Sequence, residues 1–174
     1  MKKVLWIAVI LMHSVTIYAY EASDTGSADD SGVQNNVAIG EDSLASGTAN
    51  DPSAVIGNMA EATGINTVAI GNKSGASGER ASAIGYGTSA GGNDSVAIGR
   101  DANASGGKAQ AFGYKAEATK SSATAIGESA KSSGEDATAI GTEAVASDIR
   151  SSAIGFQAEA SNRDTVAIGS YTVA

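Results

Sequence analysis

The chain has 174 residues, a formal net charge of −8 and no cysteine. Its single tryptophan and single histidine, Trp6 and His13, lie in an N-terminal export signal, so the mature chain lacks His- and Cys-based nucleophiles and the commonest transition-metal ligands. We therefore expect no catalytic residue, no bound metal and no cofactor. Removing Lys2 and Lys3 with the signal leaves nine basic and nineteen acidic residues, a net charge of −10, which argues against nucleic acid as a partner.

Residues 1–19 have the pattern of a secretory signal peptide. Lys2 and Lys3 precede an apolar run over residues 4–12, and Ile17 and Ala19 suit an A-x-A-like cleavage site. The run is shorter than the roughly 20 residues that span a bilayer, and the chain has no second candidate. We expect an exported protein that does not insert directly into a membrane.

Residues 20–34 are rich in Ser, Gly and Asp and contain almost nothing apolar to bury. Such a composition is typical of a flexible, solvated segment. We predict an acidic Ser/Gly leader here, followed by repeats over residues 35–174.

The repeats are ten short apolar phrases, each closed by a glycine. The closing glycines are Gly40, Gly57, Gly71, Gly85, Gly99, Gly113, Gly127, Gly141, Gly155 and Gly169. The interval is fourteen residues throughout, except for a first interval of seventeen that contains Asn50, Asp51 and Pro52. A fixed period indicates a solenoid, and we interpret the longer interval as a three-residue loop that does not interrupt the stack.

Each coil carries a second small-residue column. Alanine stands five residues after most closing glycines, as in Ala90 and Ala104, and glycine is frequent two residues later, with Lys120, Asp148 and Asn162 as exceptions. Recurrent glycine excludes long helices and leaves two short strands per coil. Because Asp and Asn tolerate a left-handed backbone, we predict positive φ in this second glycine column.

The side chains predict how a coil is packed. Very short corners bring the two sheets close together, so only small side chains such as alanine fit between them. Residues alternate faces along a strand, which directs the neighbouring large apolar column outward. That predicted interface column is Ile39, Ile56, Ile70, Ile84, Ile98, Phe112, Ile126, Ile140, Ile154 and Ile168. An exposed apolar ridge predicts self-association; the alternative is a wider monomeric solenoid with isoleucine inside and alanine outside.

Tyr86, Tyr114 and Phe156 each follow a closing glycine, in a column otherwise occupied by polar residues. Exposed corner aromatics suit a recognition surface, and we take these three as the candidate ligand surface. The alternative is that they lie flat over neighbouring turns. Acidic residues such as Asp42 and Asp101 do not recur in one column, so a solvated face explains them better than a calcium site.

The segment Asn93-Asp94-Ser95-Val96-Ala97-Ile98-Gly99, with Ala102, Ala104 and Gly106, resembles the head repeat of YadA-like trimeric autotransporter adhesins, N-S-V-A-I-G-x-x-S-x-A-x-G. Residues 67–71 and 165–169 repeat it. The resemblance implies a left-handed parallel β-roll that assembles as a homotrimer on the surface of a Gram-negative bacterium. It also implies partners in host extracellular matrix, such as collagen, or in sibling cells.

The chain departs from that family in its last coil, which is incomplete, and in the lack of a neck, stalk or membrane anchor. This favours a truncated adhesin remnant, with a fragment completed elsewhere or a secreted head as alternatives. Two other function classes are weaker. An ice-binding solenoid needs a regular threonine array, but Gln110 and Ser152 flank the pair Thr124 and Thr138 in their column. A solenoid enzyme needs clustered acids and bases. We expect a non-catalytic adhesin head.

Overall fold

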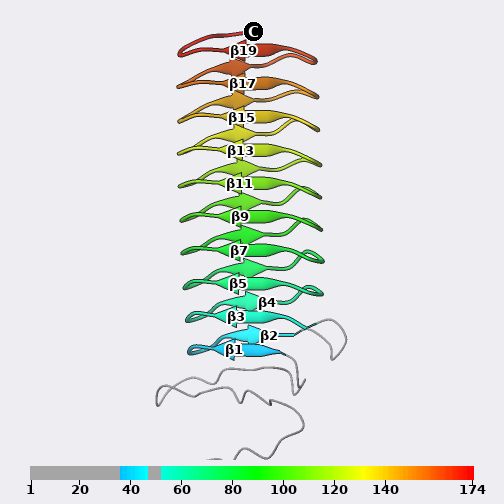
Figure 1. The fold of residues 1–174 in the computed structure, drawn as a ribbon, viewed down its shortest axis with the longest axis vertical. Coiled ribbons are helices and arrows are strands. Elements are labelled where there is room, and N and C mark those ends of the chain that lie inside the picture. The colour runs from blue at the N-terminus through cyan, green and yellow to red at the C-terminus, as the bar shows by residue number, and fades with distance from the viewer. Residues whose placement is uncertain (1–35, 47–51) are drawn as a thin grey trace, which may run out of the picture.

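The computed structural model describes residues 36–46 and 52–174. The predicted signal (1–19), the predicted leader (20–34) and the loop at Asn50 and Asp51 lie outside these residues. The described chain is a straight stack of coils with a strand on each side and no helix (Figure 1). The predicted all-β solenoid with two short strands per coil is confirmed.

Successive strands belong alternately to two parallel sheets, so each coil contributes one strand to each sheet. The ten-stranded sheet contains β1 (Val37–Ile39), β3 (Ala54–Ile56), β5 (Val68–Ile70), β7 (Ser82–Ile84), β9 (Val96–Ile98), β11 (Gln110–Phe112), β13 (Thr124–Ile126), β15 (Thr138–Ile140), β17 (Ser152–Ile154) and β19 (Val166–Ile168). The nine-stranded sheet contains β2 (Leu44–Ala45), β4 (Glu61–Ala62), β6 (Gly75–Ala76), β8 (Ser89–Ala90), β10 (Asn103–Ala104), β12 (Glu117–Ala118), β14 (Lys131–Ser132), β16 (Val145–Ala146) and β18 (Glu159–Ala160).

Strand pairing is in register with the sequence repeat. In β7 and β9, for example, Ala83 pairs with Ala97 and Ile84 with Ile98. Each sequence column is therefore a column in space along the rod. Strand β1 pairs with β3 across the seventeen-residue interval in the same register, so the extra residues leave the stack intact.

Alanine fills the space between the sheets. The central residue of the three-residue strands and the second residue of the two-residue strands are buried; Ala97 and Ala104, for example, have no exposed surface. Val55 is the one larger aliphatic side chain in this buried column among the described residues. The neighbouring isoleucines point out of the roll, so the alternative of an isoleucine-filled interior is wrong.

Most buried serines and threonines fit this interior because their hydroxyls donate to backbone carbonyls. The Ser74 hydroxyl donates to the carbonyl of Gly71 at 2.8 Å, and that of Thr67 donates to the carbonyl of Gly64 at 3.0 Å. Both bonds reach back three residues, a common side chain to backbone pattern. Ser95 differs, since its buried hydroxyl is the one without a partner in the described part of the chain.

The corners correct one sequence-based prediction. Within residues 52–174, the second glycine column does not have positive φ; the left-handed residues lie two positions further on, as in Arg80 (φ 56°) and Asp94 (φ 57°). Glycine is favoured in the column for lack of room instead: a Cβ on Gly92 would lie 1.8 Å from the carbonyl oxygen of Gly106 in the next coil. Lys120, Asp148 and Asn162, the exceptions in this column, do not adopt positive φ either.

The left-handed residues extend the hydrogen-bond ladder around both corners. The N–H of Asp101 donates to the Tyr86 carbonyl of the preceding coil at 2.8 Å, and the N–H of Asp94 donates to the Glu79 carbonyl at 2.7 Å. Adjacent coils are thus bonded at their strands and at their turns. The roll presents its side chains on a rigid frame of two outer faces and two corners.

Candidate functional site: the outer faces and corners of the roll

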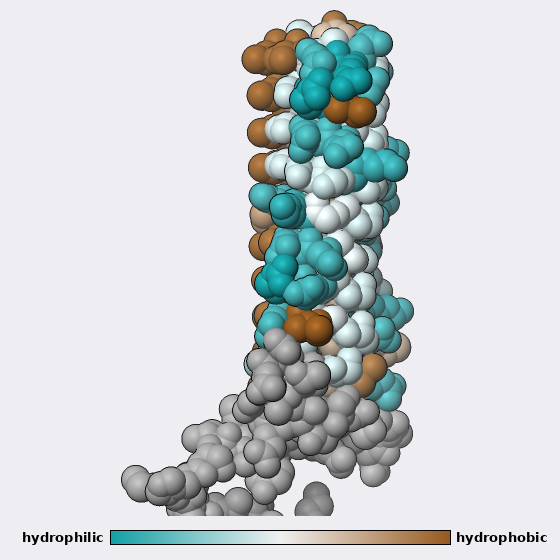
Figure 2. All heavy atoms as spheres, turned by 90° about the vertical axis from the view of Figure 1, so that its right-hand side faces the viewer, coloured by the Kyte–Doolittle hydropathy of each residue, from teal (hydrophilic) through white to brown (hydrophobic). Residues whose placement is uncertain are grey.

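The outer face of the ten-stranded sheet carries the predicted interface column, which we call the Ile ridge. Most of its members are more than a third exposed, from 36% for Ile70 to 66% for Ile168, while Phe112 and Ile140 are half-buried. In-register pairing stacks each of these side chains on the next. Figure 2 shows hydrophobic atoms in a column along one edge of the rod, with hydrophilic atoms beside it midway.

A second column on the same face is mixed. Val68 and Val96 are half-buried, whereas Gln110 is exposed. Thr124 and Thr138 pair with each other on adjacent strands. In the same column Gln110 precedes the pair and Ser152 follows it. The threonine array of an ice-binding surface therefore stops after two coils.

The outer face of the nine-stranded sheet is mostly polar, with Leu44 and Val145 as half-buried aliphatic members. Glu61, Lys131 and Glu159 are exposed there, and Lys131 Nζ lies 3.6 Å from Glu117 Oε2 of the adjacent strand. The roll thus has one apolar and one polar broad face around the same alanine interior.

The first corner, which follows each closing glycine, carries the predicted aromatics. Tyr86 and Tyr114 lie two coils apart and enclose Arg100, whose guanidinium carbon is 5.8 Å from the first ring centre and 5.5 Å from the second. Lys115 Nζ lies 5.2 Å from the Tyr114 ring centre. We call Tyr86, Arg100, Tyr114 and Lys115 the Tyr–Arg patch. Cations at this distance from aromatic rings are attracted to their faces.

Phe156 lies apart from that patch. Its ring packs edge-on against Tyr171, with ring centres 5.2 Å apart. All three predicted aromatics are exposed, Tyr86 most of all at 49%. Sequence reasoning missed Arg100 and Tyr171, although the fourteen-residue spacing of Tyr86, Arg100 and Tyr114 was a signal for the first.

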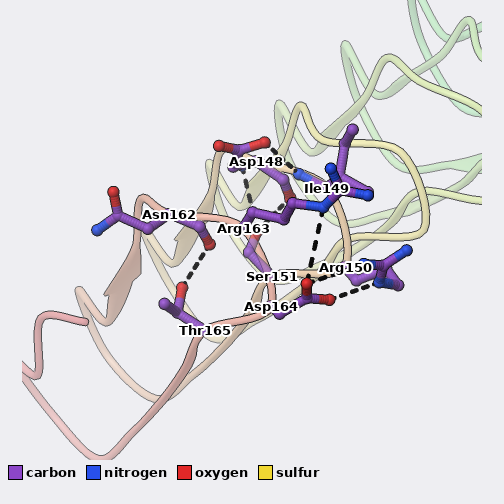
Figure 3. A network of polar contacts seen from close by, with 8 residues as sticks. All are labelled: Asp148, Ile149, Arg150, Ser151, Asn162, Arg163, Asp164 and Thr165. Atoms are coloured by element: carbon purple, nitrogen blue, oxygen red, sulfur yellow. Dashed lines mark hydrogen bonds and ion pairs between the residues drawn. The ribbon is translucent and has the colours of Figure 1, made fainter.

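The second corner carries a column of charges that alternate in sign and are interrupted once by Ser122: Arg80, Asp94, Lys108, Asp136, Arg150 and Asp164. Arg150 Nη2 donates to Asp164 Oδ2 at 2.8 Å (Figure 3), and Arg80 Nη2 donates in the same way to Asp94 Oδ2 at 3.0 Å. Hydrogen bonding to the guanidinium holds the pKa of Asp94 and of Asp164 below its ordinary value. These exposed pairs link adjacent coils.

Close by, the carboxylate and carbonyl of Asp148 accept hydrogen bonds within the turn that contains Arg150. Its Oδ1 accepts from the Ile149 N–H at 2.6 Å, and its carbonyl accepts from the Ser151 hydroxyl at 2.7 Å (Figure 3).

Within residues 36–46 and 52–174, no three acidic side chains gather closely enough to hold a metal ion. The same residues contain no helix with the length and apolarity needed to cross a bilayer.

Comparison with protein families gives one match. The YadA head domain repeat, in windows of two copies, matches residues 52–74, 76–102, 90–116, 104–130, 118–144, 132–158 and 146–172. These windows cover most of the described roll and agree with the repeat on which the resemblance was based. No curated protein is similar enough to the chain to count as a match. The chain belongs to the YadA head domain family, whose members are non-enzymatic, adhesin-type domains of exported surface proteins.

Proposed function

We propose that this chain is an adhesin head that is exported through the signal at residues 1–19, assembles as a homotrimer through the Ile ridge, and attaches a Gram-negative bacterium to host matrix or to sibling cells. The observation that carries the proposal is the pairing of an alanine interior with a continuous exposed Ile ridge on one face. The family membership supports the same role.

The energetics favour burial of the Ile ridge. Complete burial of an isoleucine is worth about 1.5 to 3 kcal/mol, so covering a side chain that is more than a third exposed adds about 1 kcal/mol. Eight such positions per chain sum to roughly 8 kcal/mol before the cost of association is subtracted. The alanine side chains inside one roll bury little apolar area. Burial of the Ile ridge between chains is therefore a substantial source of stability.

Measuring the absolute mass of residues 20–174 by light scattering behind a sizing column tests the assembly. We expect three chains per particle at micromolar concentration. A stable monomer would contradict the proposed use of the Ile ridge. Handedness, which the family resemblance implies to be left-handed, does not enter this test.

For the ligand-binding surface we propose the first corner. Tyr86, Tyr114 and Phe156 project from the rod at turns whose backbone is bonded to both neighbouring coils, so binding needs little reordering. Arg100 adds hydrogen-bond donors between the two tyrosine rings. Aromatic and Arg side chains together are typical of the centres of protein recognition surfaces.

Binding of labelled protein to immobilised collagen, fibronectin and laminin tests this surface. Replacing Tyr86, Tyr114 and Phe156 together with Ser should weaken matrix binding at least tenfold and leave the particle mass unchanged. Arg150→Gln, at the second corner, is the matched control and should bind as the parent does. Unchanged binding by the triple variant would remove the three aromatics from the site, and no matrix binding by the parent would favour cell–cell agglutination.

A further inference from the structure

Three Asn-x-Ser triplets lie in the described chain: Asn72-Lys73-Ser74, Asn93-Asp94-Ser95 and Asn103-Ala104-Ser105. In an exported protein this triplet is an acceptor for a sugar on the asparagine amide, provided that the middle residue is not proline. We propose that Asn103 is a glycosylation site of this protein and that the structure separates it from the other two triplets. The inference rests on the proposed export but not on the proposed trimer.

The serine hydroxyls make the first distinction. Ser74 is buried and its hydroxyl donates to the Gly71 carbonyl at 2.8 Å, while Ser95 is completely buried between the sheets. Ser105 is exposed. Of the three triplets, only that of Asn103 presents its hydroxyl to an enzyme from the folded roll.

The asparagine amides make the second distinction. Nδ2 of Asn72, the atom that would receive the sugar, donates to Oδ1 of Asn58 at 2.9 Å. Oδ1 of Asn93 accepts from the backbone N–H of Glu79 at 3.1 Å. Asn103 makes no side-chain hydrogen bond within residues 36–46 and 52–174, so its amide can rotate toward a donor sugar.

The position of Asn103 on the roll leaves room for a glycan. Asn103 opens β10, and Ser105 follows two residues later on the same outer side of the nine-stranded sheet. The strand on one side pairs Ser89 with Asn103, and Gly91 occupies the position equivalent to Ser105 one coil earlier. These small residues leave the sheet surface low on that side of the acceptor, while on the other side Asn103 pairs with Glu117. A sugar here lies on the polar face, away from the Ile ridge.

Asp101 adds a further feature. It stands two residues before Asn103, where the other triplets have Ile70 and Gly91. An acidic side chain at this position gives a transferring enzyme a charged group to recognise beside the triplet. The carboxylate of Asp101 lies at the first corner, 3.4 Å from Arg100 Nε, with about a third of its side chain exposed.

The reaction is a substitution at the anomeric carbon of a sugar activated as a diphosphate ester. Nδ2 of Asn103 forms the new C–N bond, the C–O bond to the diphosphate breaks, and the diphosphate leaves with the bonding pair of electrons. One amide proton passes to a base of the transferring enzyme. No oxidation or reduction takes place, and the sugar diphosphate is the only co-reactant.

Intact mass and peptide fragmentation of the protein, isolated from the cells that naturally produce it, test the proposal. We expect added hexose-type mass on the peptide that contains Asn103, lost in both Asn103→Gln and Ser105→Ala and retained in Ser105→Thr. Asn72→Gln and Asn93→Gln are the matched controls and should retain the mass. Absence of sugar on Asn103 in the parent, or sugar only on Asn72 or Asn93, would overturn the inference. Circular dichroism confirms that each variant keeps its β-structure, and particle mass, measured separately, reports on the proposed trimer.

Discussion

The two sheets of the roll share one interior but differ on their outer faces. Ala97 in β9 and Ala104 in β10 are equally inaccessible. On the outside, β9 presents Ile98, whereas β10 presents Asn103. The narrow gap between the sheets requires small side chains on both inner faces. The inner columns are therefore fixed by the fold, whereas the outer columns are free to differ with function.

The largest expected effect comes from charging the apolar outer face. Ile98→Asp combined with Ile126→Asp places six carboxylates in the proposed trimer interface, where unpaired charge is costly to bury. We expect the particle mass to fall to that of one chain and the melting temperature to drop by 10 °C or more, about 2 to 3 kcal/mol or more in a domain of this size.

The polar face supplies the matched control for that variant. Ser89→Asp combined with Thr119→Asp adds the same charge on the outer side of the nine-stranded sheet. This variant should keep the parent mass and melting temperature. If both double variants dissociate, net charge rather than the Ile ridge controls assembly, and the functional difference between the faces disappears.

The next effect concerns two glycines with different surroundings. Gly99 has φ of +132°, and a Cβ there would lie 2.5 Å from the Gly113 carbonyl oxygen, whereas nothing lies within 4 Å of a Cβ on Gly75. We expect Gly99→Ala to cost about 2 to 3 kcal/mol of unfolding free energy. Gly75→Ala should be neutral or stabilise by up to about 1 kcal/mol. Urea denaturation monitored by circular dichroism measures both, and equal losses would mean that the corner does not constrain the backbone.

A smaller effect tests whether the two inner faces are equivalent. Ala97→Leu and Ala104→Leu each insert a large side chain between the same two sheets, and overpacking of this kind costs about 1 to 3 kcal/mol. We expect similar losses from the two variants in the same urea titration. A loss confined to one variant would show that one sheet can move outward and the other cannot.

The period made most of this architecture predictable. A column of alanine beside a column of isoleucine, repeated every fourteen residues, specified which side chains were inside and which were stacked. The corner backbone was not predictable in the same way. Left-handed φ occurs at Lys73, Arg80 and Glu143, residue types that give no signal for it, because the ladder to the preceding coil determines the peptide orientation there. The Tyr–Arg patch was half predicted, since its aromatics were identified and its cation was not.

The smallest expected effect lies at the second corner and depends on pH. The pKa of Asp94 and that of Asp164 are lowered in the folded chain by hydrogen bonds to Arg80 and Arg150. A carboxylate with a lowered folded pKa stabilises the fold above its unfolded pKa of about 3.9, and this contribution is lost as the pH falls through the folded pKa. Asp94→Asn combined with Asp164→Asn should therefore lower the melting temperature by a degree or less at pH 7 and flatten its decline below about pH 4.

Arg80→Gln combined with Arg150→Gln provides the complementary test, because removing the cations should flatten the decline in the same pH range. Both differences should shrink in 1 M salt, where the screening length falls to about 3 Å. If the double asparagine variant instead loses stability equally at all pH values, the carboxylates act through corner packing and not through charge. In that case the charged column at the second corner would be required for stability of the fold, as the alanine columns are. Only the polar outer surfaces would then remain free to vary with function.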